Sequence, residues 1–362
     1  MRKQFFKVAA AMLVVGMMGS CREKVPDPEM YELGVMIRNA GNYFDNNGSI
    51  SFLRREKSTA EVDLFLKENG RSLTGNAQDY TEVGGHSIIL LDNSSPGLDK
   101  IEIVNMGTFK SEATLTAPDI ENPRAVVGIS DSKAYVSCWD ATGDFSNFYK
   151  NPGYIAVIDL DNFKVIRKIP VPKGAEHMVK IGNEVFLGAV GGTENLTVID
   201  ATTDTVKRSI KLGASPDPID VDANGKLWVK GNGVVYRVNP RTDAVEATLR
   251  VGTNPLKSPS NYAITPDRRG FYFVYSFYDP TDSYKEKGET YYFSIDDATI
   301  AADKPFVNRV FTGLGVDPMQ GLIYAGVTPS YKQSGYVIRY RTDGSVVDSI
   351  RVDVAPSGFM FK

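Results

Sequence analysis

Histidine, cysteine and tryptophan are scarce in this chain, and each occurs twice among its 362 residues. His86 and His177 are therefore the only imidazoles, and no Ser-His-Asp set has a recognisable nucleophile elbow. No group of residues has metal-ligand spacing, and no glycine-rich phosphate loop follows a strand and opens a helix. These absences argue against catalysis. We expect that the protein is not an enzyme, holds no metal and carries no bound cofactor.

One segment comes close to a calcium-binding loop. In "DVDANG", Asp220, Asp222 and Asn224 occupy alternate positions, as the first ligands of such a loop would. The twelfth position is Gly231, where a bidentate glutamate is required. Because Asn-Gly is also the ordinary chemistry of a hairpin turn, we interpret this segment as a turn.

Neither sign of charge forms a block along the sequence. The 41 basic and 44 acidic side chains leave a net charge of -3. Binding to nucleic acid by phosphate neutralisation requires a basic patch, so we expect no nucleic-acid partner. The 42% hydrophobic and 23% charged content is typical of a folded body with a water-exposed surface.

Long apolar runs are absent except at the N-terminus. "MRKQFFKVAAAMLVVGMMGSC" has a basic start, an apolar run over residues 8–18 and small residues before Cys21, which is the pattern of an export signal. The run is too short to span a bilayer comfortably. "MGSC" resembles a bacterial lipobox, although Met18 stands where leucine is usual, and a plain signal peptide is the alternative. We expect residues 1–20 to be removed, Cys21 to be acylated, and residues 21–32 to form a lipidated tether that anchors the protein without spanning the membrane.

An internal repeat follows. "GYIAVIDLDNFKVIRKIPVPKGAEHMVKIGNEVFLGAVG" from Gly153, "ENLTVIDATTDTVKRSIKLGASPDPIDVDANGKLWVKGN" from Glu194 and the segment from Gly233 have the same order of alternating strands and turns. The spacing is about 40 residues with four strands per unit. This period predicts the blades of a β-propeller.

The short strand that would line the central channel occurs seven times. Its copies are "NAQDYTEV", "RAVVGIS", "EHMVKI", "DPIDVD", "NYAITP", "TGLGVDP" and "SGFMFK". The last copy ends the chain, and "GVMIRNA", "GSISFLRR" and "AEVDLFLKEN" near the N-terminus supply the strands that its blade lacks. The sequence therefore predicts an all-β fold over residues 33–362, a seven-bladed β-propeller closed by three N-terminal strands that pair with the C-terminal strand.

These repeats carry a family resemblance. "VIDATTDTVKRSIKLGASPDPIDVDANGKLWV" resembles the YncE-type seven-bladed propellers. "NAGNYFDNNGSISFL", "VDLFLKENGRSLTGNAQD" and "GLGVDPMQGLIYAG" resemble a lipoprotein family of Bacteroidetes that includes the cell-surface cobalamin-capturing propeller BtuG. The resemblance covers Leu33 to Lys362. It implies nutrient capture beside a TonB-dependent outer-membrane transporter, at the surface of a Gram-negative cell.

Connection length is concentrated on one face of the predicted ring. In a propeller, every connection from the second to the third strand of a blade emerges on the same face as the connections between blades. Four such connections are long: Asn39–Gly48, Trp139–Gly153, Ser276–Thr290 and Gly326–Gly335. Stability does not require long loops, and scaffolds commonly carry their function on them.

Aromatic side chains are concentrated in the same connections: Tyr43, Phe44, Trp139, Phe145, Phe148, Tyr149, Phe277, Tyr278, Tyr284 and Tyr331. Tyrosine and tryptophan combine a large apolar area with a polar group, which suits a bulky amphipathic ligand or a partner protein. The alternative is that about half of these rings fold back onto the blades. His177 opens an inner strand near the channel mouth, where it is either a ligand contact or a hydrogen-bonded wall residue. Asp79, Asp217 and Asn261 lie near other strand ends and either supply polar contacts or cap backbone groups.

Three functions are compatible with this face. The first is capture of a bulky small-molecule ligand, for which the resemblance names cobalamin or another corrinoid, and its delivery to a TonB-dependent transporter. The second is a protein-protein interaction scaffold in an outer-membrane nutrient-uptake complex. The third is an enzyme, a lyase or hydrolase, that acts on a glycan or lactone. We favour the first, in a lipid-anchored protein of the outer membrane.

Overall fold

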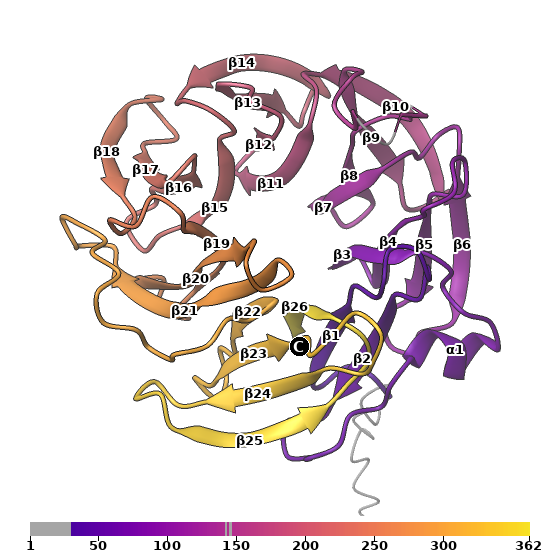
Figure 1. Cartoon of the computed structure of the whole chain (residues 1–362). Coiled ribbons are helices and arrows are strands. Elements are labelled where there is room, and N and C mark those ends of the chain that lie inside the picture. The colour runs from indigo at the N-terminus through magenta and orange to yellow at the C-terminus, as the bar shows by residue number, and fades with distance from the viewer. Residues whose placement is uncertain (1–29, 142, 145–146) are drawn as a thin grey trace, which may run out of the picture.

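The computed structural model describes residues 30–362 except 142, 145 and 146. In this part of the chain, seven antiparallel sheets stand around a central axis, with one strand of each sheet innermost (Figure 1). The predicted seven-bladed β-propeller is confirmed, and each of the seven strands expected to line the channel forms a strand. The signal peptide and the lipidated Cys21 lie outside the described residues.

Five blades have four strands, and the first strand of each blade is innermost (Figure 1). Their strands are β3 (Asn76–Val83), β4 (His86–Asp92), β5 (Lys100–Asn105) and β6 (Ser111–Thr116); β7 (Pro123–Ser130), β8 (Lys133–Cys138), β9 (Gly153–Asp159) and β10 (Lys164–Val171); β11 (Ala175–Ile181), β12 (Glu184–Ala189), β13 (Asn195–Asp200) and β14 (Thr205–Lys211); β15 (Asp217–Val221), β16 (Leu227–Lys230), β17 (Val234–Val238) and β18 (Val245–Arg250); and β22 (Gly313–Val316), β23 (Ile323–Val327), β24 (Tyr336–Tyr340) and β25 (Val346–Arg351).

Two blades have three strands in the described structure. One consists of β19 (Ser258–Ile264), β20 (Gly270–Asp279) and β21 (Lys285–Ser294), and the other of β26 (Pro356–Phe361), β1 (Val35–Asn39) and β2 (Ser49–Leu53). Burial explains the sequence patterns. The second strand of a blade is covered by a neighbouring blade on each face, so β23 is buried throughout, whereas the outer strand β6 alternates between half-buried and exposed residues.

The two ends of the chain meet in one blade, as predicted. β26 pairs with β1 in the antiparallel register Val35↔Phe361, and β1 pairs in turn with β2. Phe359 and Phe361 place their ring centroids 5.8 and 5.2 Å from that of Tyr324 in the preceding blade. The last strand of the chain therefore joins the first strand to the final blade.

The prediction of a third N-terminal strand is wrong. Its residues form the short helix α1 (Leu64–Asn69), and only an isolated bridge between Glu61 and Phe52 extends the sheet. Local signals explain the helix: the Asp63 carboxylate accepts a hydrogen bond from the Leu66 N–H at 3.2 Å, and Gly70 ends the helix with a φ of 68°. Two N-terminal strands, not three, complete the closing blade.

The end of this helix gives a modest prediction. A Cβ at Gly70 would meet nothing within 4 Å, so only the left-handed backbone opposes a side chain there. We expect Gly70→Ala to lower the free energy of unfolding by about 1 kcal/mol in urea titrations. Gly70→Asn, which tolerates this conformation, should lose less, and equal losses in the two variants would contradict this account.

The predicted loop over Ser276–Thr290 is also wrong in extent. β20 and β21 pair from Gly270↔Ser294 to Asp279↔Lys285, so only residues 280–284 connect them. The pairing simply continues through residues that were expected in the loop, up to the turn. The fourth strand of this blade is replaced by an irregular connection over residues 295–312, which bridges to β21 at Thr290 and Val307.

Packing begins before the predicted start of the propeller at Leu33. Tyr31, which we expected in the tether, is fully buried; its ring centroid lies 5.2 Å from that of Phe52, and its hydroxyl donates to Glu68 at 2.6 Å. Across the described residues, no helix is long and apolar enough to cross a membrane.

Candidate functional site

One cluster of predicted site residues surrounds Trp139, directly after β8. The Trp139 ring lies 4.8 Å from Tyr149 and 6.4 Å from Phe148 between centroids, and the Arg124 guanidinium stacks 3.9 Å above its centre. Tyr149 in turn lies against the backbone of Gly191, where an added Cβ would come within 3.0 Å of the ring. The three rings are half-buried. Stacking on arginine holds the indole in place and is worth about 0.5–2 kcal/mol.

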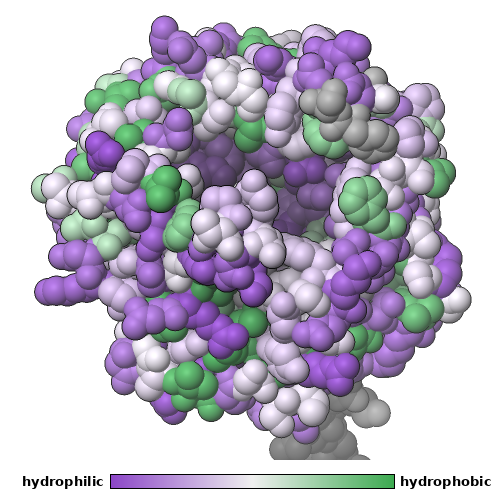
Figure 2. Space-filling model, in the orientation of Figure 1, coloured by the Kyte–Doolittle hydropathy of each residue, from purple (hydrophilic) through white to green (hydrophobic). Residues whose placement is uncertain are grey.

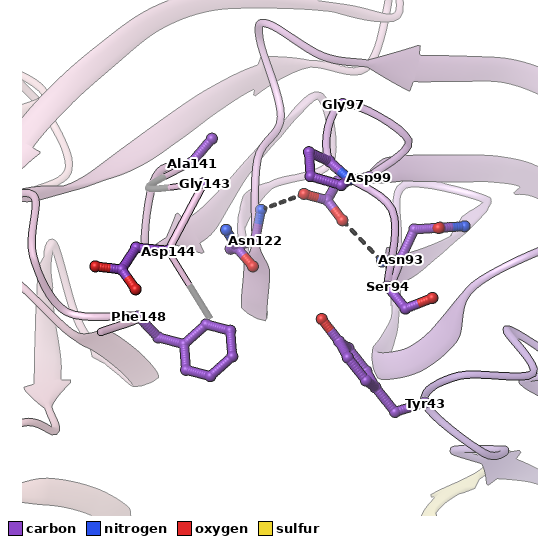
Figure 3. Close-up of a pocket in the computed structure, with 11 residues that line it drawn as sticks. Tyr43, Asn93, Ser94, Gly97, Asp99, Asn122, Ala141, Gly143, Asp144 and Phe148 are labelled. Carbon is purple, nitrogen blue, oxygen red and sulfur yellow. Dashed lines mark hydrogen bonds between the residues drawn. The ribbon is translucent and has the colours of Figure 1, made fainter. Parts of the chain in front are cut away.

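A small cavity separates this cluster from the β1–β2 connection. Phe148 and Tyr43 lie on opposite sides of the cavity in Figure 3. Its polar wall is fixed by Asp99, whose carboxylate accepts the N–H groups of Asn93 at 2.8 Å and Asn122 at 2.9 Å. Next to Tyr43, the ring of Phe44 is 81% exposed. The two connections thus present aromatic rings across a rigid polar seam.

A second cluster lines a larger cleft between the β20–β21 hairpin and the β23–β24 connection. Tyr278, Tyr284 and Tyr331 are 65%, 70% and 53% exposed there. The cleft has a volume of about 700 Å³, within the range of small-molecule sites. An ion pair between Lys332 and Asp45, at 3.8 Å, joins this connection to the β1–β2 connection. The two clusters therefore lie along one arc of the same face.

Two predicted residues fall outside these clusters. Phe277 is half-buried within β20 and is not among the residues that line the cleft. Phe145 lies outside the described residues. The structure therefore brings eight of the ten predicted rings into the arc, and their contact with a ligand stays a prediction.

The channel mouth carries a network of charges from different blades. Arg38 pairs with Asp79 at 3.3 Å, and Arg124 reaches Asp92 at 3.2 Å. Arg124 also lies 3.8 Å from Glu176. Figure 2 views the ring along its axis and shows a hollow at its centre lined mainly by hydrophilic residues.

β-bulges place part of this network. The pairing register shifts near the first residues of five inner strands, which lie on the loop face: β3, β7, β11, β15 and β19. A bulge turns a side chain away from the regular alternation, and bulges are common next to functional sites. Arg124, Glu176 and His177 lie within these shifts.

His177 is a hydrogen-bonded wall residue whose side chain is also 53% exposed to the channel. Its Nδ1 lies 2.8 Å from Oδ2 of the buried Asp217, and Lys230 Nζ binds the same oxygen at 3.0 Å. Asp217 raises the pKa of His177 above its ordinary value. Burial alone would raise the pKa of Asp217, but the two cations lower it to about 2.

Two other carboxyl groups of the channel mouth have raised pKa values, unlike Asp217. Burial raises the pKa of Asp92 to about 7, although Arg124 opposes the shift. Burial also raises the pKa of Glu176. Near neutral pH the mouth therefore has less negative charge than its four carboxyl groups would suggest.

Sequence reasoning missed most of this network. Arg38, Asp92, Arg124, Glu176 and Lys230 were not predicted as site residues, because nothing in a single repeat marks them. The signal that was available is position: each lies close to the loop-face end of a first or second strand. Of the polar residues that were noted, Asn261 donates to the carbonyl of Phe311 at 2.8 Å and so satisfies a backbone group.

The hydrogen bonds at Asp220–Gly225 support the interpretation of this segment as a hairpin turn. Asp222 accepts hydrogen bonds from the N–H groups of Asn224 and Lys226 and from Nε1 of Trp228, at 2.8–2.9 Å. Its carboxylate therefore orders the turn and the buried indole. Among the described residues, no group of three or more His, Cys, Asp or Glu could hold a metal ion.

Comparison with known proteins places the chain in a family. Residues 33–362 match the family described as "Domain of unknown function (DUF5074)", and the chain belongs to that family. No curated protein matches its sequence. The resemblance to the YncE-type propellers and to the corrinoid-capturing lipoproteins stays a prediction.

Solved structures share the fold at low identity. A quinoprotein alcohol dehydrogenase-like protein of Bacteroides thetaiotaomicron has 17% identity and a TM-score of 0.67 over 91% of this chain and 78% of its own. A candidate 6-phosphogluconolactonase of Bacteroides fragilis has 10% identity and a TM-score of 0.62 over 93% of this chain and 100% of its own. At such identities, these similarities establish the fold alone.

Proposed function

We propose that the protein is a lipid-anchored binding protein of the outer membrane, whose loop face captures a bulky amphipathic ligand, cobalamin or another corrinoid, for a TonB-dependent transporter. The observation that carries this proposal is the arc of rings, from Tyr278 through Tyr43 to Tyr149, around a polar channel mouth. The export signal and the family resemblance support the location and the ligand.

The arc has the properties of a binding surface for a large, partly polar molecule. Exposed rings supply apolar area, while the clamped Trp139 supplies a rigid surface that loses little conformational freedom on binding. The charged mouth supplies hydrogen-bond donors and acceptors next to it. A ligand that carries both an apolar face and polar substituents could use both parts at once.

Isothermal titration of residues 23–362 with cyanocobalamin tests the proposal. We expect one-to-one binding, and we expect a variant with Trp139→Ala, Phe148→Ala and Tyr149→Ala to lose at least about 100-fold in affinity, because aromatic anchors typically contribute 2 kcal/mol or more each. The matched control is Tyr292→Ala, a 47% exposed ring that lines a different cleft together with Thr265–Asp267, at the β19–β20 turn. No heat at micromolar concentrations would overturn the corrinoid assignment.

A protein-binding scaffold is the second candidate, and one observation favours it. The Thr290 N–H donates to the Val307 carbonyl at 3.0 Å, so the backbone groups of Thr290 face away from β20. By the alternation of an antiparallel ladder, Glu286 and Gly288 present theirs to the same open edge, in the wall of the 700 Å³ cleft. An extended peptide could add a strand there. Copurification of a porin-like partner, lost when Glu286→Pro removes an edge N–H, would favour this function.

Two solved structures with a similar fold are described as enzyme-like proteins, but the candidate site favours binding over catalysis. His177 is bound through Nδ1 to Asp217, as a catalytic histidine can be. An enzyme that used it would lose turnover on His177→Ala. We propose a binding role because the clustered aromatic rings and the cleft point to a bulky ligand rather than to a reaction centre.

A further inference from the structure

A separate cavity of about 210 Å³ lies in the channel mouth, away from the aromatic clusters. Its wall includes two cationic side chains, Arg38 and Lys230, the imidazole of His177, and one carboxylate, Asp217. Asp217 is 1% exposed and already holds two of these groups, through His177 Nδ1 and Lys230 Nζ. The wall of the cavity therefore has more positive than negative charge.

The hydrogen-bonding groups of the wall show the same imbalance. His177 Nε2 has no hydrogen-bond partner among the described residues, whereas Nδ1 is held by Asp217. Lys230 Nζ, which Asp217 holds, has further donors to offer, because an ammonium group carries three N–H bonds. An acceptor-rich group in the cavity would bind Lys230 Nζ and, where the imidazole is charged, His177 Nε2.

Neighbouring carboxyl groups offset part of this excess. Asp79 pairs with Arg38 at 3.3 Å, and Glu176 adjoins His177 in sequence on β11. Lys230 lies on β16 and faces His177 across Asp217 of β15. Burial raises the pKa of Glu176, whereas Asp217 raises that of His177. Both shifts make the cavity less negative than the ordinary pKa values of these two groups would.

We propose that this cavity is an oxyanion site, in which a carboxylate or phosphate group sits between His177, Lys230 and Arg38. The inference deepens the proposed function, on which it rests for the identity of the larger ligand: the captured molecule carries an anionic group that enters the channel mouth while its apolar part lies on the rings. The site itself can be tested with small anions alone.

Histidine NMR gives a sharp test, because the chain has two histidines. We expect phosphate or succinate to shift the ring signals of His177 and to raise its measured pKa, since an anion bound next to the imidazolium favours the charged form. His86 is the internal control: its Nδ1 pairs with Glu112 at 2.6 Å, at the far end of the blade from the loop face. Sodium chloride at the same ionic strength controls for screening.

Two variants identify the cations. His177→Asn keeps a side-chain amide that can bind Asp217 but removes the charge, and Lys230→Met removes the ammonium. Each should weaken anion binding about fivefold, as expected for one charge at hydrogen-bonding distance in a water-like dielectric. Lys207→Met is the matched control, because Lys207 pairs with Glu184 at 2.8 Å, at the other end of the blade. His177→Asn also assigns the two histidine signals.

The outcomes separate the two proposals. A response to phosphate alone, to succinate alone or to both supports the oxyanion site and names the anion. Signals of His177 that move no more with either anion than with chloride, or affinities unchanged in both variants, would overturn it. Cyanocobalamin binding without an anion response would leave the proposed function standing, and an anion response without cyanocobalamin binding would leave the site standing without that ligand.

Discussion

A chain that ends at Gly358 should fail to fold as a closed ring. The truncation removes Phe359 to Lys362, and with them most of the β26–β1 ladder and two rings packed against Tyr324. It also removes Lys362, whose Nζ pairs with Glu82 at 3.0 Å. Loss of a buried phenylalanine typically costs about 3–5 kcal/mol; Phe359 and Phe361 are half-buried, but both are lost together with three of the five register pairs of the ladder. We therefore expect a total loss of more than about 5 kcal/mol, comparable with the whole stability of a typical domain.

Urea titration followed by circular dichroism measures this loss. The matched control is Met319→Ala in the adjacent blade, because Met319 is 70% exposed and should be close to neutral. We also expect the truncated chain to associate, since it leaves β1 with an open strand edge. A truncated protein that is monomeric and unfolds at the midpoint of the full chain would show that the ring does not depend on β26.

The second large effect is expected for Arg124→Met. Arg124 is the shared partner of Asp92, Glu176 and the Trp139 ring, and its side chain is 16% exposed. Removing one partner of a buried ion pair leaves the remaining charge without compensation. Asp92 can avoid that state by taking up a proton, which at one pH unit above a pKa of about 7 costs about 1.4 kcal/mol. Together with the lost stacking on Trp139, we expect the free energy of unfolding to fall by about 2–3 kcal/mol at pH 8. Release of the Trp139 ring should also weaken ligand binding.

The cost should depend on pH in a defined direction. Burial raises the pKa of Asp92 to about 7, above its unfolded value of 3.8. Between these values the native state binds more protons than the unfolded state, so this group contributes stability at low pH that is lost as the pH rises through 7. At pH 5 Asp92 is protonated with or without Arg124, so the variant should lose only about 1–2 kcal/mol there, chiefly the stacking on Trp139.

A double variant completes this test. Adding Asp92→Asn to Arg124→Met removes the buried charge, so the stability of the double variant should depend less on pH than that of the single variant. Urea titrations at pH 5 and pH 8 measure both. An Arg124→Met deficit that is the same at the two pH values would contradict the assignment of a raised pKa to Asp92.

The fold was predictable from the sequence because each blade repeats the same physical pattern. Inner strands such as Asp217–Val221 recur at intervals of 41–55 residues, and the unpaired strand at the C-terminus requires partners from the N-terminus. The error at α1 has a local cause: Asp63 and Gly70 are helix-capping residues, and the repeat alone does not show that they override the expected strand. The extended β20–β21 hairpin was missed because turn residues interrupt a pattern that resumes beyond them.

The candidate site was predictable only in part. Aromatic rings in long connections stand out within their own segments, so Trp139 and Tyr331 could be identified from the sequence. The charges of the mouth do not stand out, because their partners come from distant segments: Arg38 pairs with Asp79 of the next blade and also donates to the Ser357 carbonyl, 319 positions away. Such a network exists only after the ring has closed.

The blade that both termini share also determines when during synthesis the ring can close. β1 is synthesised among the first residues of the ring. Its inner neighbour β26, a strand of six residues, is the last of the described strands to be synthesised. Pairing over such a sequence separation is intrinsically slow. A chain released before β26 has been made therefore leaves the inner edge of β1 unpaired. Such a product differs from a chain that contains β26 in a way that proteases and chaperones can recognise.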